Sequence, residues 1–460
     1  MKKVGKPVFF LVAAVIMAMG FLAVLGISET YGDITTDKIK GVDDISWGTA
    51  VSGGAELKFV PADGVSATDD QIKEVRSLMA VRLDNLGIND SSLKTDGSAI
   101  TVKLPFEKGG DFDIDDIAQE LSERAALTFR EGYEYDEATG KPAGVTLENI
   151  IFSGAEVQNA EAVYTTESNM NVCYVKLTLN DEAKAAFEQA TTKLLGNRIS
   201  IWMDDTLLAV QSVSRIVNDG VAYISGDMTA YQAMNMATKV NVGALPIGMK
   251  LESSAEFAPA VAGGKTVFAA GFAVLIFAAA VYMSAKFKFV GLVGVIALLG
   301  QAVVLIMALT GFVPAIAAVP VNVSSVLGAA AAVVLGVYTL IEAQKSITEK
   351  AKTAKVAKAA VYEGVRSGAK STAKLNGIVF VVCLVLMVMF ASAGSVFSKA
   401  LFGILSFIGK GANDVIYPFA HMLLWGVVGS VVMNLGAYLL MISSLAGFKK
   451  FSALELYGKK

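Results

Sequence analysis

Six long apolar runs limit the possible folds of this chain more than any other feature of its sequence. Such runs approach or exceed the ~20 residues that a helix needs to cross the hydrocarbon core of a bilayer. The first run lies near the N-terminus, and the other five follow Lys265. The six runs are residues 8–27, 267–285, 290–312, 321–343, 376–393 and 415–446. We therefore expect a membrane-embedded bundle of six transmembrane helices.

The first run is either a secretory signal or an uncleaved anchor. It is longer than the roughly 7–15 apolar residues of a typical signal, and Gly26-Ile27-Ser28 is a poor cleavage site. We expect an anchor, with residues 1–7 in the cytoplasm.

Charge divides the chain between two environments. Of 460 residues, 54% are hydrophobic and 18% are charged, but residues 28–264 contain 37 Asp and Glu against 19 Lys and Arg, whereas the remainder contains 5 against 20. Lys and Arg are retained on the cytoplasmic side of membrane proteins. The sequence therefore predicts an acidic extracytoplasmic domain at 28–264, five clustered spans at 265–446 with a basic cytoplasmic loop at 344–375, and a cytoplasmic tail at 447–460.

The acidic region alternates between strand and helix patterns, which predicts an α+β domain. A helix is expected between strands 54–60 and 98–104, and Thr68 and Gln71 have the spacing of a capping box at its start. Further strands are expected at 126–130, 171–179, 198–203, 207–213 (after an Asp204-Asp205 turn) and 221–225, and helices at 115–124, 181–195 and 229–240. This order predicts two ferredoxin-like split βαβ modules, at about 45–130 and 171–250, joined by a polar stretch around 131–170.

One span, a large outer domain and five clustered spans is the layout of half an RND-type transporter. Several segments are similar to motifs of the SecD family of Sec protein-export subunits, namely WGTAVSGGAELKF (47–59), RLDNLGIND (82–90), KLPF (103–106), LSERAALTFR (121–130), ISGDMTAYQAMNMATKVNVGALPIGMKL (224–251), KFVGLVGVIALLGQ (288–301) and PFAHMLLWGVVGSVV (418–432). The resemblance implies a structural role for Gly53, Gly54, Arg82, Asp84, Gly87, Gly243, Leu245, Pro246, Gly291 and Gly426. In the membrane region, small residues such as Gly291 and Gly426 also allow helices to approach closely in lipid.

The chain departs from the family at the membrane carboxylates. In the family, one span carries V-D-A-N-V-L-I-F-E-R and the next opens with D-A-N-x-T-T, and buried carboxylates of this kind serve proton-driven transport. When Glu342 is aligned with the family's Glu, Leu335 takes the place of the Asp, and alignment on Asn376 puts Lys374 at the second Asp. Glu342, Asn376 and His421 remain as weak candidates for an ion relay. Either a partner subunit holds the ionisable residues, or the chain acts as a scaffold that does not use the proton-motive force.

Other chemistry has little support in the sequence. His421 is the only histidine, and Cys173 and Cys383 belong to different environments, so a His/Cys metal site, a disulfide and a Ser-His-Asp triad are not expected. A phosphate-binding G-x-x-x-x-G-K-[ST] loop is missing from the sequence. We expect no enzyme activity, no cofactor and no nucleic-acid partner.

The resemblance implies a subunit that assists the late translocation and release of secreted polypeptides in a bacterial plasma membrane. The implied partners are a SecF-like subunit, the SecY channel complex, unfolded secreted polypeptides and membrane lipids. Two alternatives stay open: an RND-like exporter of small molecules or lipids, and a membrane-anchored adaptor that transports nothing.

Overall fold

The computed structural model describes residues 4–31, 34–86, 88, 90–106, 113–167, 170–226, 228–312, 319–390 and 415–458. The chain divides into two compact units. The helical unit comprises Met1–Ser28, Asp37–Gly53 and Ala258–Lys460, and the sheet unit comprises Glu29–Thr36 and Gly54–Phe257. Each unit has its own hydrophobic core.

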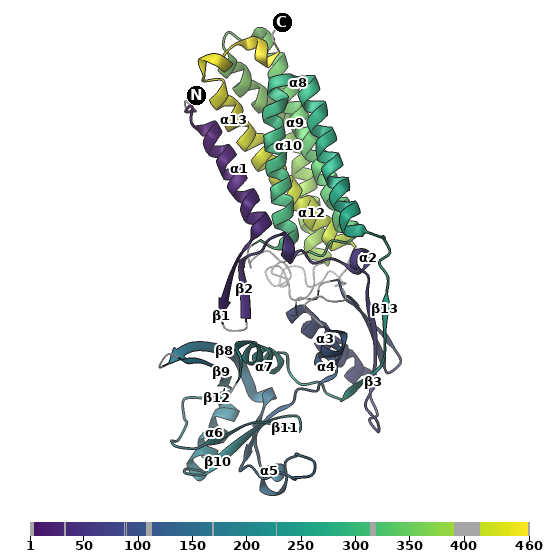
Figure 1. Cartoon of the computed structure of the whole chain (residues 1–460), viewed down its shortest axis with the longest axis vertical. Helices are drawn as coiled ribbons and strands as arrows, with labels where there is room; N and C mark the ends of the chain where they lie inside the picture. The colour runs from purple at the N-terminus through teal and green to yellow at the C-terminus, as the bar shows by residue number, and fades with distance from the viewer. Residues whose placement is uncertain are drawn as a thin grey trace. The chain divides into compact units, whose positions relative to one another are not determined.

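Long helices form the helical unit and run alongside one another in one bundle (Figure 1). They are α1 (Val8–Leu25), α8 (Gly264–Thr310), α9 (Val323–Thr353), α10 (Ala357–Phe390) and a continuous last helix made of α12 (Ile416–Gly429), the π-helix η3 (Ser430–Ala437) and α13 (Tyr438–Leu445). Short elements of this unit are η1 (Val42–Asp44), α2 (Thr49–Ser52), η4 (Lys449–Phe451) and η5 (Leu454–Tyr457).

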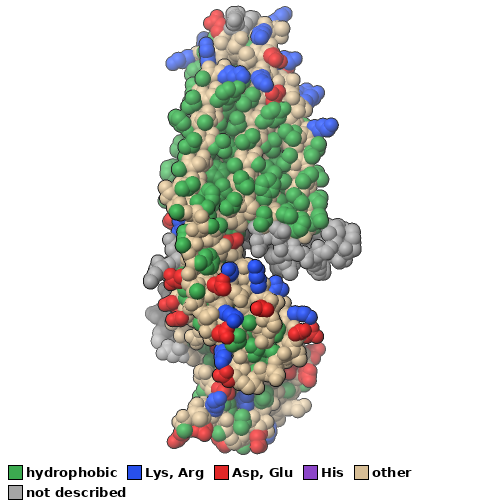
Figure 2. All heavy atoms as spheres, turned by 90° about the vertical axis from the view of Figure 1, so that its right-hand side faces the viewer, with side chains coloured by type: hydrophobic (Ala, Val, Ile, Leu, Met, Phe, Trp, Pro, Cys, Tyr) green, Lys and Arg blue, Asp and Glu red, His purple; other side chains and the backbone are tan. Residues whose placement is uncertain are grey.

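The surface of the bundle is apolar over most of its length. In the described part of the chain, five helices are long and apolar enough to cross a membrane. Figure 2 shows hydrophobic side chains covering one side of the bundle, with Lys and Arg side chains towards its end. Large apolar residues are unusually exposed, with Phe10 at 63% and Leu25 at 76%. Apolar surface on this scale is suited to contact with lipid.

The longest helix, α8, is broken at Lys288, whose φ of 50° and ψ of −121° are not helical. A Cβ atom on Gly291 would lie 2.1 Å from the carbonyl oxygen of Met283. Residues eight apart in a continuous helix are separated by about 12 Å. The chain therefore turns back at Lys288, between the apolar runs predicted at 267–285 and 290–312.

Small residues allow α9 and α12 to pack closely. A Cβ atom on Gly426 would lie 1.9 Å from Cβ of Ala332, and one on Gly328 would lie 2.4 Å from the carbonyl oxygen of Phe419. Gly328, Ala332 and Gly336 follow one another at four-residue intervals on one face of α9. This spacing is typical of helices that approach closely in lipid.

The first module of the sheet unit is one antiparallel sheet with two helices, α3 (Asp69–Asn85) and α4 (Ile114–Ser122). Its strands have the order β13 (Met249–Phe257), β3 (Gly54–Pro61), β5 (Ala99–Pro105), β4 (Ser92–Asp96). The predicted capping box of α3 is present, because the N–H of Thr68 donates to Gln71 at 3.0 Å and the N–H of Gln71 donates to Thr68 at 3.3 Å. The apolar face of α3 is buried in the core, as its periodicity predicts: Ile72, Val75, Met79 and Leu83.

The second module contains two further sheets. One has the order β11 (Thr206–Ser212), β10 (Arg198–Met203), β6 (Leu127–Glu131), β7 (Ile150–Ser153), and the other β12 (Val221–Ser225), β9 (Met170–Leu179), β8 (Val157–Glu167). Its helices are α5 (Gly144–Glu148), η2 (Gly154–Glu156), α6 (Asp181–Lys193) and α7 (Ala230–Val242). Phe129, Phe152 and Phe187 form an aromatic cluster in its core, with centroid separations of 4.3–6.0 Å.

The division between modules differs from the expected one. Strand β6 pairs with β10 of the second module, although its residues were expected to end the first module. Strand β13, which was not expected, pairs with β3 of the first module. The stretch 131–170, expected to be a polar connection, contains β7, β8 and α5. Strand β7 was missed because it has only 4 residues, and β8 was missed because polar residues interrupt its apolar pattern. Pairing with β6 and β9 stabilises them.

One edge of β8 is occupied by a side chain. Oδ1 of Asn241 accepts a hydrogen bond from the N–H of Ala160 at 2.7 Å, and Nδ2 of Asn241 donates to the carbonyl oxygen of Ala160 at 2.7 Å. The amide of Asn241 thus makes the two hydrogen bonds that a neighbouring strand would make. A final two-stranded sheet is formed by β1 (Ile27–Tyr31) and β2 (Ile34–Ile39).

Candidate functional site

The two segments that connect the modules of the sheet unit are hydrogen-bonded to each other. The N–H of Leu245 donates to the carbonyl oxygen of Arg124 at 2.8 Å, and Nε of Arg124 donates to the carbonyl oxygen of Leu245 at 3.2 Å. The chain therefore crosses between the modules twice at one place. We call this place, residues 120–126 and 242–246, the junction.

Arg82, in the last turn of α3, fastens the junction to the first module. Its Nη1 donates to the carbonyl oxygens of Glu120 at 2.8 Å and Glu123 at 2.5 Å, and its Nη2 donates to that of Arg124 at 3.3 Å. The side chain is only 2% exposed. This burial lowers the pKa of Arg82, against the charges of Glu120, Glu123 and Asp204. The planar fork of an arginine can bind several carbonyl oxygens, which a lysine cannot do in the same way.

Asp204, in the second module, binds the backbone just before β6. Its carboxylate accepts hydrogen bonds from the N–H groups of Ala125 at 3.0 Å and Ala126 at 2.9 Å. Asp204 and Ala125 have φ values of 52° and 59°, in the left-handed region that residues with a side chain seldom adopt. The predicted Asp204-Asp205 turn is present, and its first carboxylate is a structural ligand of the junction.

Lys239 links α7 of the second module to the end of α4. Its Nζ lies 3.1 Å from Oε2 of Glu120 and 2.5 Å from Oε2 of Glu123. Burial disfavours the ammonium, but the hydrogen bond with Glu123 and the charges of both carboxylates outweigh it, so the pKa of Lys239 is raised.

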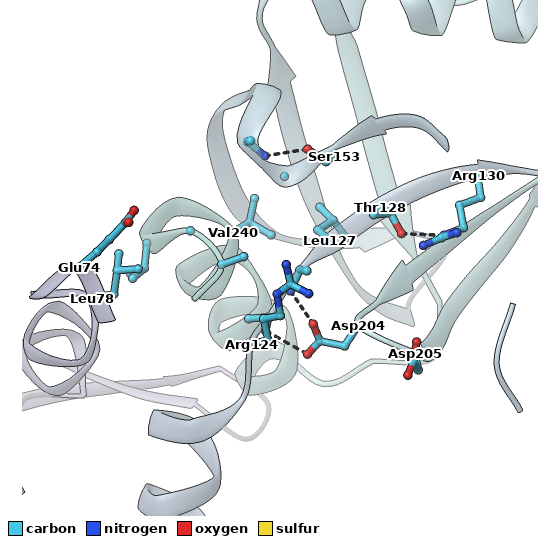
Figure 3. Close-up of a pocket in the computed structure, with 17 residues that line it drawn as sticks. Glu74, Leu78, Arg124, Leu127, Thr128, Arg130, Ser153, Asp204, Asp205 and Val240 are labelled. Atoms are coloured by element: carbon cyan, nitrogen blue, oxygen red, sulfur yellow. Dashed lines mark hydrogen bonds between the residues drawn. The ribbon is translucent and has the colours of Figure 1, made fainter. Parts of the chain in front are cut away.

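A cavity of about 760 Å³ lies beside the junction. Figure 3 shows Glu74 and Leu78 of α3 on one side of it, Val240 of α7 near its middle and Arg130 on the far strand. Its wall combines residues 124–128 with further apolar residues and with charged residues of both signs. Such a wall offers hydrogen bonds and apolar contact without selecting one charge.

The junction brings together four residues that the resemblance singled out: Arg82, Gly243, Leu245 and Pro246. Gly243 ends α7 with a φ of 93°, a conformation that favours glycine. Leu245 is fully buried. Gly87 lies outside the described residues, as does the side chain of Asp84.

The two glycines expected at the entry to the first strand lie at the start of β3. Gly53 has a φ of 79°, and a Cβ atom on Gly54 would lie 2.3 Å from the carbonyl oxygen of Leu104. Both positions therefore require a residue without a side chain. Gly291 and Gly426 occupy the close approaches in the bundle described above.

The candidates for an ion relay are dispersed in the bundle. Leu335 is buried in α9 and Lys374 is exposed on α10. Glu342 forms an ion pair with Lys345 at 2.8 Å, three residues further along α9. His421 is 1% exposed, and its Nε2 lies 3.4 Å from the carbonyl oxygen of Ala308.

Asn376 makes an interhelical contact. Its Nδ2 donates to Oγ1 of Thr339 on α9 and to the carbonyl oxygen of Thr372, both at 3.2 Å. Oγ1 of Thr339 in turn donates to the carbonyl oxygen of Leu335 at 2.9 Å.

A polar pair that was not expected from the sequence lies against Gly336, the residue after Leu335. Nδ2 of Asn434 donates to Oε1 of Gln301 at 2.6 Å, and Nε2 of Gln301 donates to the carbonyl oxygens of Ala332 at 2.9 Å and Gly426 at 3.1 Å. Both amide residues are fully buried. The available signal was the presence of amides inside apolar runs, since polar groups at such positions are costly and often functional.

Among the residues that the structure describes, no group of three His, Cys, Asp or Glu side chains is arranged to hold a metal ion.

Comparisons with known proteins agree with the motifs. The family model "SecDF, P1 head subdomain" matches residues 130–247, which fall almost entirely in the second module. Protein translocase subunit SecD of Dictyoglomus turgidum is 28% identical over 258 residues, covering 55% of this chain and 59% of the relative. Protein translocase subunit SecD of Petrotoga mobilis is 23% identical over 466 residues, covering 93% of this chain and 92% of the relative.

The fold is also found in a solved protein. The crystal structure of SecDF in its Super-membrane-facing form matches 96% of this chain with a TM-score of 0.61 and 20% sequence identity. This chain covers 58% of that SecDF chain.

Proposed function

Because this chain belongs to the SecD family, we propose that it is an accessory subunit of the Sec translocase that assists the late translocation and release of secreted polypeptides. The observation that carries the proposal is the junction, where the motif residues Arg82, Gly243 and Leu245 meet beside a cavity. A mobile outer domain that holds an emerging chain would limit its backward movement.

The proposed topology places both termini in the cytoplasm of a bacterium and the sheet unit outside its plasma membrane. The turn at Lys288 supports counting α8 as two spans, which makes six. The order β3-α3-β4-β5-α4-β13 supports a ferredoxin-like first module. Impermeant thiol labelling of single cysteines in the 344–375 loop and in the sheet unit tests the orientation, because only the latter should react from outside.

The cavity beside the junction is the proposed contact for the polypeptide. Ala155 is exposed on its wall, and an Ala155→Trp variant should fill it and slow the release of secreted proteins. Ala138→Trp, at an exposed turn residue that does not line the cavity, is the matched control. Equal release kinetics for the two variants would remove the cavity from the proposal.

Coupling to the proton-motive force is proposed to depend on a partner. Leu335 cannot carry a proton, and Glu342 is held by Lys345. A SecF-like subunit that contributes ionisable residues would restore coupling, and without it the chain would act as a scaffold. The sequence of that partner is the most direct test, because membrane Asp and Arg residues there would support coupling.

Association with the export machinery tests the whole proposal. The chain should co-purify with a SecF-like subunit and with the SecY channel complex, and its loss should slow export. A clean purification without Sec components, together with normal export kinetics, would overturn the proposal. Altered efflux or lipid composition without an export defect would instead favour an RND-like exporter, and function that is insensitive to uncouplers would favour an adaptor.

A further inference from the structure

Polar groups from three helical segments meet around the Gln301–Asn434 pair in the interior of the bundle. A Cβ atom on Gly336 would lie 1.8 Å from Oε1 of Gln301 and 2.6 Å from Nδ2 of Asn434. Gly336 is therefore what leaves room for the amide pair against α9. Thr339, which receives the hydrogen bond from Asn376, lies three residues further along the same helix.

The pair also lies on unusual backbone. Asn434 is in the π-helix η3, Ser430 begins that π-helix one turn earlier, and both side chains are fully buried. A π-helix is wider than an α-helix, and such segments occur frequently at functional sites. The segment is flanked by α-helix on both sides.

The groups left open at this site are oxygens. In the described part of the chain, Oδ1 of Asn434 and Oγ of Ser430 are buried and have no hydrogen-bond partner among protein atoms. In contrast, Nε2 of Gln301 already donates two hydrogen bonds and Nδ2 of Asn434 donates to Gln301. The amide oxygen of Asn434 therefore needs a donor, whereas the hydroxyl of Ser430 can donate or accept.

The charge of the ligand decides whether it can bind to these polar groups. The groups that form the site are amides, hydroxyls and backbone carbonyls, all of which are neutral. A cation would be buried beside them without an opposite charge, which is costly. An anion would be equally uncompensated, because none of these groups carries a positive charge. A small neutral molecule that both donates and accepts hydrogen bonds fits the site.

We propose that Gln301, Asn434 and Ser430 form a charge-neutral site inside the bundle that binds water rather than an ion. Buried water of this kind is typically held by about three hydrogen bonds to otherwise unpaired polar groups. The site is independent of the proposed export role, because it follows from the contacts of the bundle alone. It would remain uncharged at every pH.

Radiolytic hydroxyl labelling of the full-length chain in detergent tests the proposal, because X-rays convert bound water into radicals at its binding site. Met433 is the reporter: it adjoins Asn434, and its Sδ lies 3.1 Å from the position of a Cβ on Gly300. Met441, fully buried in α13, is the internal control. Met433 should be oxidised several times faster than Met441, and an Asn434→Leu substitution should bring the two rates together.

Two smaller substitutions keep the test decisive if Asn434→Leu disturbs folding. Ser430→Ala removes one open oxygen and should lower the Met433 rate, whereas Ser443→Ala, at a buried serine further along the same helix, should leave it unchanged. Equal oxidation of Met433 and Met441 in the unmodified chain would overturn the proposal. A Met433 rate that is the same in the Ser430→Ala and Ser443→Ala variants would do so as well.

Discussion

The side chain of Arg82 supplies hydrogen bonds to several carbonyl oxygens at the end of another helix, α4. The last carbonyl groups of a helix have no partner within the helix, and Arg82 donates to three carbonyl oxygens at and just after the end of α4. The same side chain holds the segment that leads into the second module. A residue of the first module therefore determines where the second one begins.

Replacing Arg82 should destabilise the sheet unit. Arg82→Met keeps an apolar stem but leaves three carbonyl oxygens without their donor, and we expect a loss of roughly 3 kcal/mol in the free energy of unfolding. Urea unfolding of the full chain, followed by tryptophan fluorescence of the buried Trp202, measures the change. Arg76→Met is the control, because exposed Arg76 on the same helix makes one hydrogen bond, to Leu93.

Lys239 should make the stability of the sheet unit sensitive to high pH. Its pKa is raised in the folded chain, so its contribution is fully present below the unfolded value, about 10.4, and is lost as the pH rises through the folded value. The difference in unfolding temperature between the unmodified chain and Lys239→Met should therefore be larger at pH 8 than at pH 12. A difference that does not change with pH would show that packing, rather than charge, makes the contribution.

At the scale of elements, the turn within α8 depends on a glycine. Gly291 lies against the backbone of Met283, where a methyl group has no space. Gly291→Ala should lower the unfolding temperature of the chain in detergent by several degrees. Gly271→Ala, on the same helix with nothing within 4 Å of the added atom, should leave it unchanged or raise it slightly, since alanine favours a helix over glycine. A similar effect of both substitutions would contradict the tight turn.

The sequence predicted those elements whose periodicity is local. Helix α3 and strand β10 were expected near their observed positions, since the spacing of their apolar residues is enough to define them. Strands β4, β8 and β13 were missed. β4 and β13 lie at edges of the first sheet and expose much of their length, so their sequences lack the alternation of a half-buried strand.

The sequence identified some residues of the candidate site but not the contacts between them, because those contacts join residues that are far apart in sequence. The motif residues Arg82, Gly243 and Leu245 are far apart in sequence, and a resemblance could single them out without showing that they meet. Asp204 and Lys239 were missed as ligands of the junction, because each looks like an ordinary surface charge until its partners are known. Gln301 was missed because only the glycines of its motif, residues 288–301, were considered.

At the scale of the whole molecule, the proposal that this chain does not couple to the proton gradient by itself can be tested at Leu335. A Leu335→Asp variant adds the carboxylate that the family pattern has at the position aligned with Leu335. The next residue, Gly336, lies against the neutral amides of Gln301 and Asn434, which offer no positive charge. We expect little or no gain in gradient-dependent export, measured by the release of a secreted protein with and without an uncoupler. Leu335→Asn is the control of similar size, and a large gain confined to the Asp variant would show that the chain can still couple.

The side chain of Asn241 limits which chains can pair with the edge strand β8 of the sheet unit. An open strand edge templates the addition of further strands, and unfolded chains are ready donors of them. In the proposed export role, the sheet unit would handle such chains and would risk incorporating one irreversibly. Asn241 occupies both backbone groups of Ala160 and closes the β8 edge at that point, which in the proposed role would keep contact with a passing polypeptide reversible there.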